Sequence, residues 1–407
     1  MLKPTHSDAS RHYPNASTHK DVVLAELALR NWQKQKSTDL HTAMSKPLGM
    51  QALAKIVHEF LMSQYIKFDF GKINSSETLL LQGNLLCIAP LAKVHKVAVV
   101  VKHNKEWAIK NKLCTEKNTV LADIINCSIR SFRLANNDQL KLYSDYVTLI
   151  WMLNDIIDSN WGKIGAIKDL QKMLKIFFAH LKGLNQKDYI KADKITLPKF
   201  KFLCNAFFDI GSRLREQAID LKYFFNSVEL YFNSLIKEFT VRFNHATLSL
   251  EEQLTIRAYT SGLDTACELA YALQNIYIAS SIRENGYFKQ LQQHAYVAAI
   301  IAHDILTLGN QLKKKQVGNN YLLLKHELTK NSLQAIFNEA QYHFNTEVSR
   351  FANKTQSLLN SVLTTDYNST LTALVTLADH VQARVDWALQ TARYQERMAK
   401  VKLVTKV

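Results

Sequence analysis

The chain has 407 residues, 47% of them hydrophobic, which suffices for one large domain or two ordinary ones with a sizeable core. It contains only 11 Gly and 5 Pro, well below the usual ~7% and ~5%, which disfavours folds rich in hairpins and short loops. The formal charge is +16, but the basic residues are spread along the chain and no zinc-finger spacing accompanies them. We therefore interpret the charge as a diffuse basic surface and expect no nucleic-acid partner.

The first hundred residues have no recognisable functional motif. Residues 1–20 are polar and expected to be disordered, and residues 21–100 form an extension with helical patterns such as Ala52–Tyr65. The apolar run Leu79–Val101 is interrupted by Gln82, Pro90 and other breaks, so no transmembrane segment is predicted. The N-terminus lacks a secretory signal and the 5 cysteines form no CxxC pair, which together favour a cytoplasmic protein with reduced thiols.

Residues 101–397 read almost continuously as helix. Apolar side chains recur at three- and four-residue spacing through Leu254–Leu273, Val297–Leu308 and Val375–Arg393. The predicted fold is all-α, with residues 398–407 as a basic tail.

An acidic motif, Asn154-Asp155-Ile156-Ile157-Asp158, closes an apolar and aromatic run that contains Trp151. Positions 154 and 158 lie one helical turn apart, so Asn154, Asp155 and Asp158 can offer oxygen ligands to one hard cation. A helix that ends in solvent would explain the same residues without a metal.

A second motif places His303, Thr307 and Gln311 at i, i+4 and i+8, so all three project from one helix face. Each side chain has a lone pair for a cation, although Mg²⁺ prefers carboxylate and water oxygens. A polar seam between helices is the alternative interpretation.

Two basic elements complete the pattern. Arg257 precedes Ser261-Gly262, which can break the helix and free backbone carbonyls. Further along, the adjacent Arg393 and Tyr394 can donate hydrogen bonds to phosphate oxygens. Each element by itself is also compatible with an ordinary helix surface.

Taken together, these motifs resemble the signature of class I terpene synthases, in an order and with separations typical of the microbial enzymes. In that family an acidic motif closes a helix, an Asn-Asp-x-x-Ser-x-x-x-Glu motif follows, and an Arg-Tyr pair lies near the C-terminus. Here the three elements begin at positions 154, 303 and 393. The resemblance covers about residues 100–397. The first hundred residues have no counterpart in the short microbial enzymes.

The resemblance implies a helical barrel with a central apolar cavity, preceded here by an N-terminal helical extension. It further implies three Mg²⁺ ions, or Mn²⁺, which would be held by the two motifs across the diphosphate of a prenyl substrate. Arg257, Arg393 and Tyr394 would bind that diphosphate, and Ser261 and Gly262 would form a helix break facing it. Trp151 and Trp387 are candidates for the cavity wall that stabilises a carbocation, with plain core packing as the alternative.

Several positions depart from the family pattern. Asn154 stands where the family has Asp, and His303, Thr307 and Gln311 replace Asn, Ser and Glu. The leading prediction is a Mg²⁺-dependent terpene synthase that ionises a linear prenyl diphosphate, C15 favoured and C10 or C20 possible, as a monomer or homodimer. The alternatives are a non-catalytic protein of the same fold that has lost its metal site, and, on net charge alone, a nucleic-acid- or membrane-associated helical protein.

Overall fold

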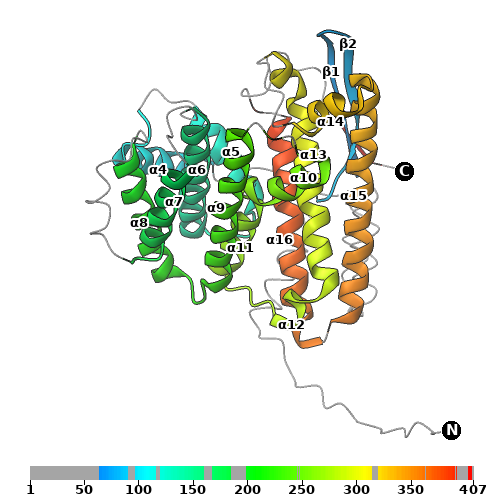
Figure 1. Cartoon of the computed structure of the whole chain (residues 1–407). Coiled ribbons are helices and arrows are strands. Elements are labelled where there is room, and N and C mark those ends of the chain that lie inside the picture. The colour runs from blue at the N-terminus through cyan, green and yellow to red at the C-terminus, as the bar shows by residue number, and fades with distance from the viewer. Residues whose placement is uncertain are drawn as a thin grey trace, which may run out of the picture.

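The computed structural model describes residues 64–89, 97–115, 120–159, 167–184, 199–244, 246, 248–313, 320–362, 364–389, 391 and 402–405. These residues form a predominantly α-helical molecule with one small β-sheet (Figure 1). The all-α class predicted from the sequence is confirmed for the body of the chain. The predictions for residues 1–20 and for Arg393 and Tyr394 concern positions outside the described residues.

The elements follow one another along the chain from the sheet through the helices and back to the sheet. In order they are β1 (Gln64–Asn74), β2 (Thr78–Leu86), α4 (Val97–Lys110), α5 (Val120–Ser131), α6 (Asn137–Ser159), α7 (Ile167–Leu181), α8 (Phe200–Gln217), α9 (Lys222–Phe243), α10 (Leu250–Thr260), α11 (Leu263–Gln274), α12 (Ser280–Arg283), α13 (Gly286–Lys313), α14 (Tyr321–Thr329), α15 (Leu333–Ser361), α16 (Thr364–Ala388) and β3 (Lys402–Thr405).

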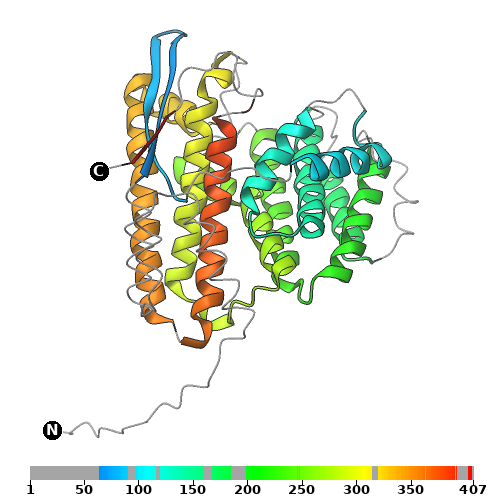
Figure 2. The same ribbon diagram turned by 180° about the vertical axis from the view of Figure 1, so that it is seen from behind.

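Two hydrophobic cores organise these helices, and Figures 1 and 2 show the two groups side by side. The first core lies among α4–α9 and is rich in aromatic rings, for example Phe177 stacked on Phe207 at 5.0 Å. The second core lies among α13, α15, α16 and the sheet. Helix α11 belongs to both, because Leu269 packs into the first core and Tyr271 into the second.

The long helices of the second core follow directly from the sequence pattern. Helix α15 buries residues such as Ile336, Phe337 and Phe344 along one stripe, the arrangement expected of an amphipathic helix. Its start is fixed by Ser332, whose hydroxyl accepts a hydrogen bond from the backbone N–H of Ala335. Among the described residues, no helix has the length and apolar content required to cross a membrane.

The three-stranded antiparallel sheet, in the order β2-β1-β3, corrects one prediction. Residues 64–86 were expected to belong to a helical extension, but residues 64–74 and 78–86 form strands β1 and β2. Residues 402–405, within the segment predicted as a basic tail, form strand β3. The hairpin is stable because Ile66, Phe68, Leu79 and other alternate side chains are buried against the second core.

The outer edge of β2 is bonded to helix α15 instead of to another strand. The backbone N–H groups of Leu80, Asn84 and Leu86 donate to the side chains of Gln334, Gln341 and Asn345, respectively. These three acceptors lie on one face of the helix, and the hairpin is thereby fixed against the second core.

Candidate active site

The acidic motif lies at the C-terminal end of α6, where the helix leaves the first core. Leu153 and Ile157 are buried, whereas Asp155 and Asp158 are exposed. Asp158, with 55% of its side chain exposed, accepts a hydrogen bond from Arg242 of α9 at 2.8 Å. Asn154 accepts one from the hydroxyl of Tyr231 at 2.7 Å. The two carboxylates therefore remain accessible to a cation at this end of the bundle.

The second motif lies near the C-terminal end of α13, and its side chains are bonded within the protein. Thr307 is buried, and its hydroxyl donates to the carbonyl of His303 at 2.8 Å. His303 Nδ1 lies 2.9 Å from a carboxylate oxygen of Asp304, and the side-chain oxygen of Gln311 accepts from Asn320. These bonds correspond to the polar seam that the sequence left open as an alternative.

Arg257 of α10 reaches α13 and forms a two-armed ion pair with Asp304, with one N–O distance of 2.8 Å. Asp304 is fully buried and also accepts from the backbone N–H of Tyr321 at 2.7 Å. Burial alone would raise the pKa of Asp304, but the charge of Arg257 and the hydrogen bonds of Arg257 and His303 lower it. The structure thus brings Arg257 directly to the second motif.

The helix break predicted at Ser261-Gly262 is present between α10 and α11. Gly262 has φ = +69°, a left-handed conformation that favours glycine. Its Cα lies against α6, since an added Cβ would be 3.5 Å from Ile150 and 4.0 Å from Tyr231. Tyr231 also bonds Asn154, so this tyrosine links the break to the acidic motif.

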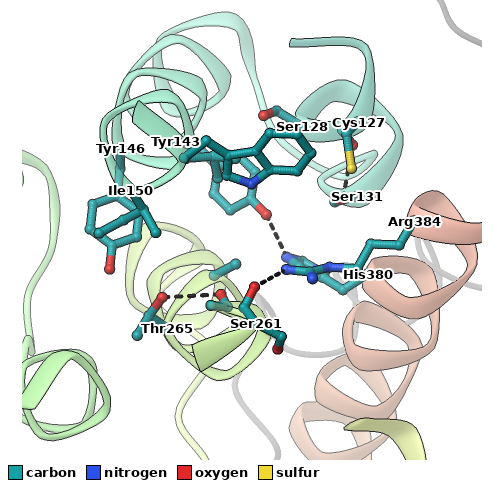
Figure 3. A pocket seen from close by; sticks show the side chains of 14 residues that line it. Cys127, Ser128, Ser131, Tyr143, Tyr146, Ile150, Ser261, Thr265, His380 and Arg384 are labelled. Carbon is teal, nitrogen blue, oxygen red and sulfur yellow. Dashed lines mark hydrogen bonds between the residues drawn. The ribbon is translucent and has the colours of Figure 1, made fainter. Parts of the chain in front are cut away.

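A central cavity of about 20 Å³ lies between α5, α6, the helix break and α16. Figure 3 shows the side chains that point into it, including Ser131, Tyr143, His380 and Arg384. This volume suits about one water molecule and is far below the ~300–1,000 Å³ of ordinary ligand pockets. The space found here is therefore far too small for the substrate cavity that the resemblance implies, and its lining includes polar side chains such as His380 and Arg384.

The polar side of the cavity has a defined protonation pattern. His380 Nδ1 lies 2.7 Å from the carbonyl of Thr376, which can only accept, so Nε2 accepts from the Tyr143 hydroxyl at 2.9 Å. Burial lowers the pKa of His380 to about 4, and the imidazole is neutral at pH 7. Arg384 donates to the backbone carbonyl of Ser261 at 2.9 Å, and this carbonyl is one that the helix break makes available.

Sequence reasoning missed His380 and Arg384. Both lie on α16, His380 seven residues and Arg384 three residues before Trp387, which the sequence did single out, so helical spacing alone could have placed them on the same face. Trp151 lines the cavity. Trp387 is buried behind it, with the two rings 4.8 Å apart and nearly perpendicular.

The two motifs differ in how well they would fit a divalent metal. Asp155 and Asp158 offer accessible carboxylate oxygens, which suit Mg²⁺. The second motif offers no carboxylate except Asp304, which is bound to Arg257. Within the described part of the chain, no group of three or more His, Cys, Asp or Glu side chains converges on one point. Of the two motifs, the one on α6 is therefore the one that presents exposed carboxylates.

The helical architecture is that of the class I terpene synthase fold. It carries an acidic motif on α6 and a helix break that follows Arg257. Residues 145–350 match the model of the family described as terpene synthase family 2, C-terminal metal binding. The chain belongs to this terpene synthase family. The family's metal-binding domain implies a divalent metal cofactor.

Individual relatives agree with this membership. Viridiflorene synthase Agr2 of Cyclocybe aegerita is 20% identical over 275 residues, which cover 65% of this chain and 66% of that protein, just under two thirds of it. Hedycaryol synthase in complex with nerolidol has a similar structure, with a TM-score of 0.57, 15% identity and coverage of 73% and 96% of the two chains. For linalool/nerolidol synthase from Streptomyces clavuligerus in complex with 2-fluorogeranyl diphosphate, the TM-score is 0.61, with 14% identity and coverage of 75% and 98%.

Proposed function

We propose that this protein is a Mg²⁺-dependent terpene synthase that ionises a linear prenyl diphosphate and releases diphosphate. C15 is the favoured chain length, with C10 or C20 as further possibilities, and the product is a terpene hydrocarbon or alcohol. One observation carries this proposal: the helix break at Gly262 packs against α6 one turn before the acidic motif, while Arg257 at the end of α10 reaches the second motif. The segment that joins α10 to α11 thus contacts α6 on one side and, through Arg257, α13 on the other.

In this proposal, the charge of each site residue decides whether it binds the metal or the diphosphate. Asp155 and Asp158 would hold the metal, with His303, Thr307 and Gln311 as weaker neutral ligands. Bound Mg²⁺ would neutralise negative charge that develops on the departing diphosphate. Arg257, together with Arg393 and Tyr394, would donate hydrogen bonds to the same diphosphate oxygens.

The cavity wall would protect the reactive hydrocarbon from water. Trp151 presents an aromatic ring, which can stabilise a cation without reacting with it. Neutral His380 adds no charge, but the guanidinium of Arg384 would repel a carbocation at close range. Because the cavity holds only about 20 Å³, binding of a prenyl chain there would require its lining side chains to move.

The second candidate is a non-catalytic member of the family. It is favoured by the internal bonds of Thr307 and Gln311 and by the small volume of the cavity. Such a protein would fold normally without releasing diphosphate. Cytoplasmic location and a monomeric or homodimeric state remain predictions under either candidate.

The experiment that separates the candidates is a turnover assay with purified protein. Geranyl, farnesyl and geranylgeranyl diphosphate are each incubated with Mg²⁺, with Mn²⁺ or with chelator, and extracted products are analysed by gas chromatography–mass spectrometry. A metal-dependent cyclic or rearranged product establishes the synthase and its substrate length. A folded protein that gives no product with any substrate supports the non-catalytic candidate.

A further inference from the structure

A second and larger cavity, of about 190 Å³, lies where α9 begins and α11 ends, next to α12. Tyr223 at the cavity and Arg242 at the acidic motif are near opposite ends of α9, roughly 30 Å apart at about 1.5 Å per residue. Figure 1 shows α12 at the lower end of the molecule, away from α10. This cavity is therefore separate from the candidate active site.

A buried ion pair forms the polar part of this second cavity. Glu268 of α11 is 6% exposed, and one of its carboxylate oxygens accepts from Arg283 at 2.6 Å. The Arg283 guanidinium lies 3.8 Å from the ring centroid of Tyr223, and its Nε atom is buried. Among the described residues nothing donates to the other oxygen of Glu268.

Aromatic and aliphatic side chains form the rest of the wall. Tyr271 and Phe224 are buried at the base, whereas Ile219 and Tyr277 at the rim are 85% and 67% exposed, among the most exposed large hydrophobic side chains described. A volume of 190 Å³ exceeds the ~150 Å³ of an apolar cavity that accepts benzene. The space therefore suits a molecule with one ring.

Charge selects the kind of molecule. The described lining residues include two carboxyl groups, Asp220 and Glu268, and one guanidinium, that of Arg283; the ammonium group of Lys222 lies beside them, 5.5 Å from the ring centroid of Tyr223. An anion would meet the carboxylates, while Arg283 is already engaged by Glu268 and Tyr223. A cation would gain a partner and aromatic surface. We propose that this cavity binds a small organic cation, an amine with one ring, whose ammonium group pairs with the open oxygen of Glu268.

Calorimetric titration of the full chain with three probes of nearly equal shape tests the proposal. It is done at pH 8, because burial raises the pKa of Glu268 to about 7 and its carboxyl group is mostly ionised above that pH. At pH 8 benzylamine is still protonated, benzyl alcohol is neutral and benzoate is an anion. We expect saturable one-to-one binding of benzylamine, binding of benzyl alcohol weaker by about tenfold or more, and none of benzoate. Equal affinity for all three probes, or no saturable binding of benzylamine, would overturn the proposal.

Variants locate the bound probe without relying on the buried ion pair. Ala272→Phe fills the cavity and should abolish binding, and Asp220→Asn should weaken it. Tyr277→Ala should weaken binding as well, whereas Tyr342→Ala, at a tyrosine 74% exposed on α15, should leave it unchanged. Unchanged affinity in Ala272→Phe would place the probe elsewhere and reject this site. Binding should persist in Asp158→Ala, which keeps this test independent of the proposed synthase activity.

Discussion

The two regions that carry the metal motifs differ in what their side chains already bind. At the end of α6, two carboxylates are exposed, and Asp158 is held by a single contact from Arg242. On α13, Thr307 is buried and bonded to its own helix, and Gln311 is bonded to Asn320. A cation approaching α6 meets two exposed carboxylates, one of them paired with Arg242, whereas a cation approaching α13 meets side chains without an exposed carboxylate that are hydrogen-bonded within the protein.

This difference shows that conserving the spacing of a motif does not conserve its chemistry. The positions on α13 still project from one face as the family pattern requires, but their side chains are bonded to the backbone and to neighbouring side chains without a metal. In the proposed enzyme, α6 would supply most of the metal affinity. The Asp158 and Gln311 predictions below test that asymmetry, and two stability predictions are added; they run from the largest expected effect to the smallest.

Replacing Asp158 by Ala should abolish turnover, with a loss of about a hundredfold or more, because it removes one of two accessible carboxylates. The matched control is Asp138→Ala, at an exposed carboxylate near the start of the same helix, and it should retain activity. The measurement is product formation with saturating Mg²⁺. Equal activity in both variants would show that α6 does not hold the catalytic metal.

Trp387→Ala should lower the free energy of unfolding by about 3–5 kcal/mol, because it deletes a buried ring. The lost contact with Trp151 joins α6 to α16, so the substitution removes a contact between the helix of the acidic motif and α16. Trp387→Phe should lower the free energy of unfolding by less than Trp387→Ala does. The exposed Tyr342→Ala should change it by no more than about 0.5 kcal/mol. Urea unfolding measures all three, and a loss as small as that of the control would exclude a structural role for the pair.

Gln311→Glu should tighten Mg²⁺ binding by about tenfold, because it adds a carboxylate to the weaker motif. The new carboxylate oxygen can still accept the hydrogen bond from Asn320, so the fold should be unaffected. Gln293→Glu, an exposed position on the same helix, is the control for a general gain of negative charge. Titration with Mg²⁺ in the presence of inorganic diphosphate gives the affinities; an equal gain in both variants would point to nonspecific attraction.

Two buried glutamates should give opposite pH dependences of stability. Burial would raise the pKa of Glu347, but His294 and His343 lower it to about 2, so its contribution is present above pH 4.5 and lost as pH falls toward 2. Burial raises the pKa of Glu268 to about 7 despite Arg283, so its contribution is present below pH 4.5 and lost as pH rises through 7. The melting temperature Tm is measured across this pH range. Its dependence on pH should become flatter on the acid side in Glu347→Gln and flatter on the neutral side in Glu268→Gln. A change on the same side in both variants would contradict these assignments.

The sequence predicted the helical body and most of the candidate site. Helix periodicity is local, so α13 and α16 could be recognised from their own residues, and so could the break at Gly262. The strands could not, because β1 and β2 owe their stability to contacts with segments more than 200 positions away, such as the bond from Leu80 to Gln334. The contact of Arg384 with Ser261 could not be predicted either. Helical spacing shows on which face of α16 Arg384 lies, but not which other segment packs against that face.

The hydrogen bonds between β2 and α15 have a consequence for how copies of this protein behave at high concentration. An unprotected strand edge is a template on which further strands add, and it is a common origin of aggregation. Here the side chains of Gln334, Gln341 and Asn345 occupy backbone donors of β2 that another molecule would use. Helix α15 thus acts as a surrogate neighbouring strand, and this edge of the sheet is closed to intermolecular pairing.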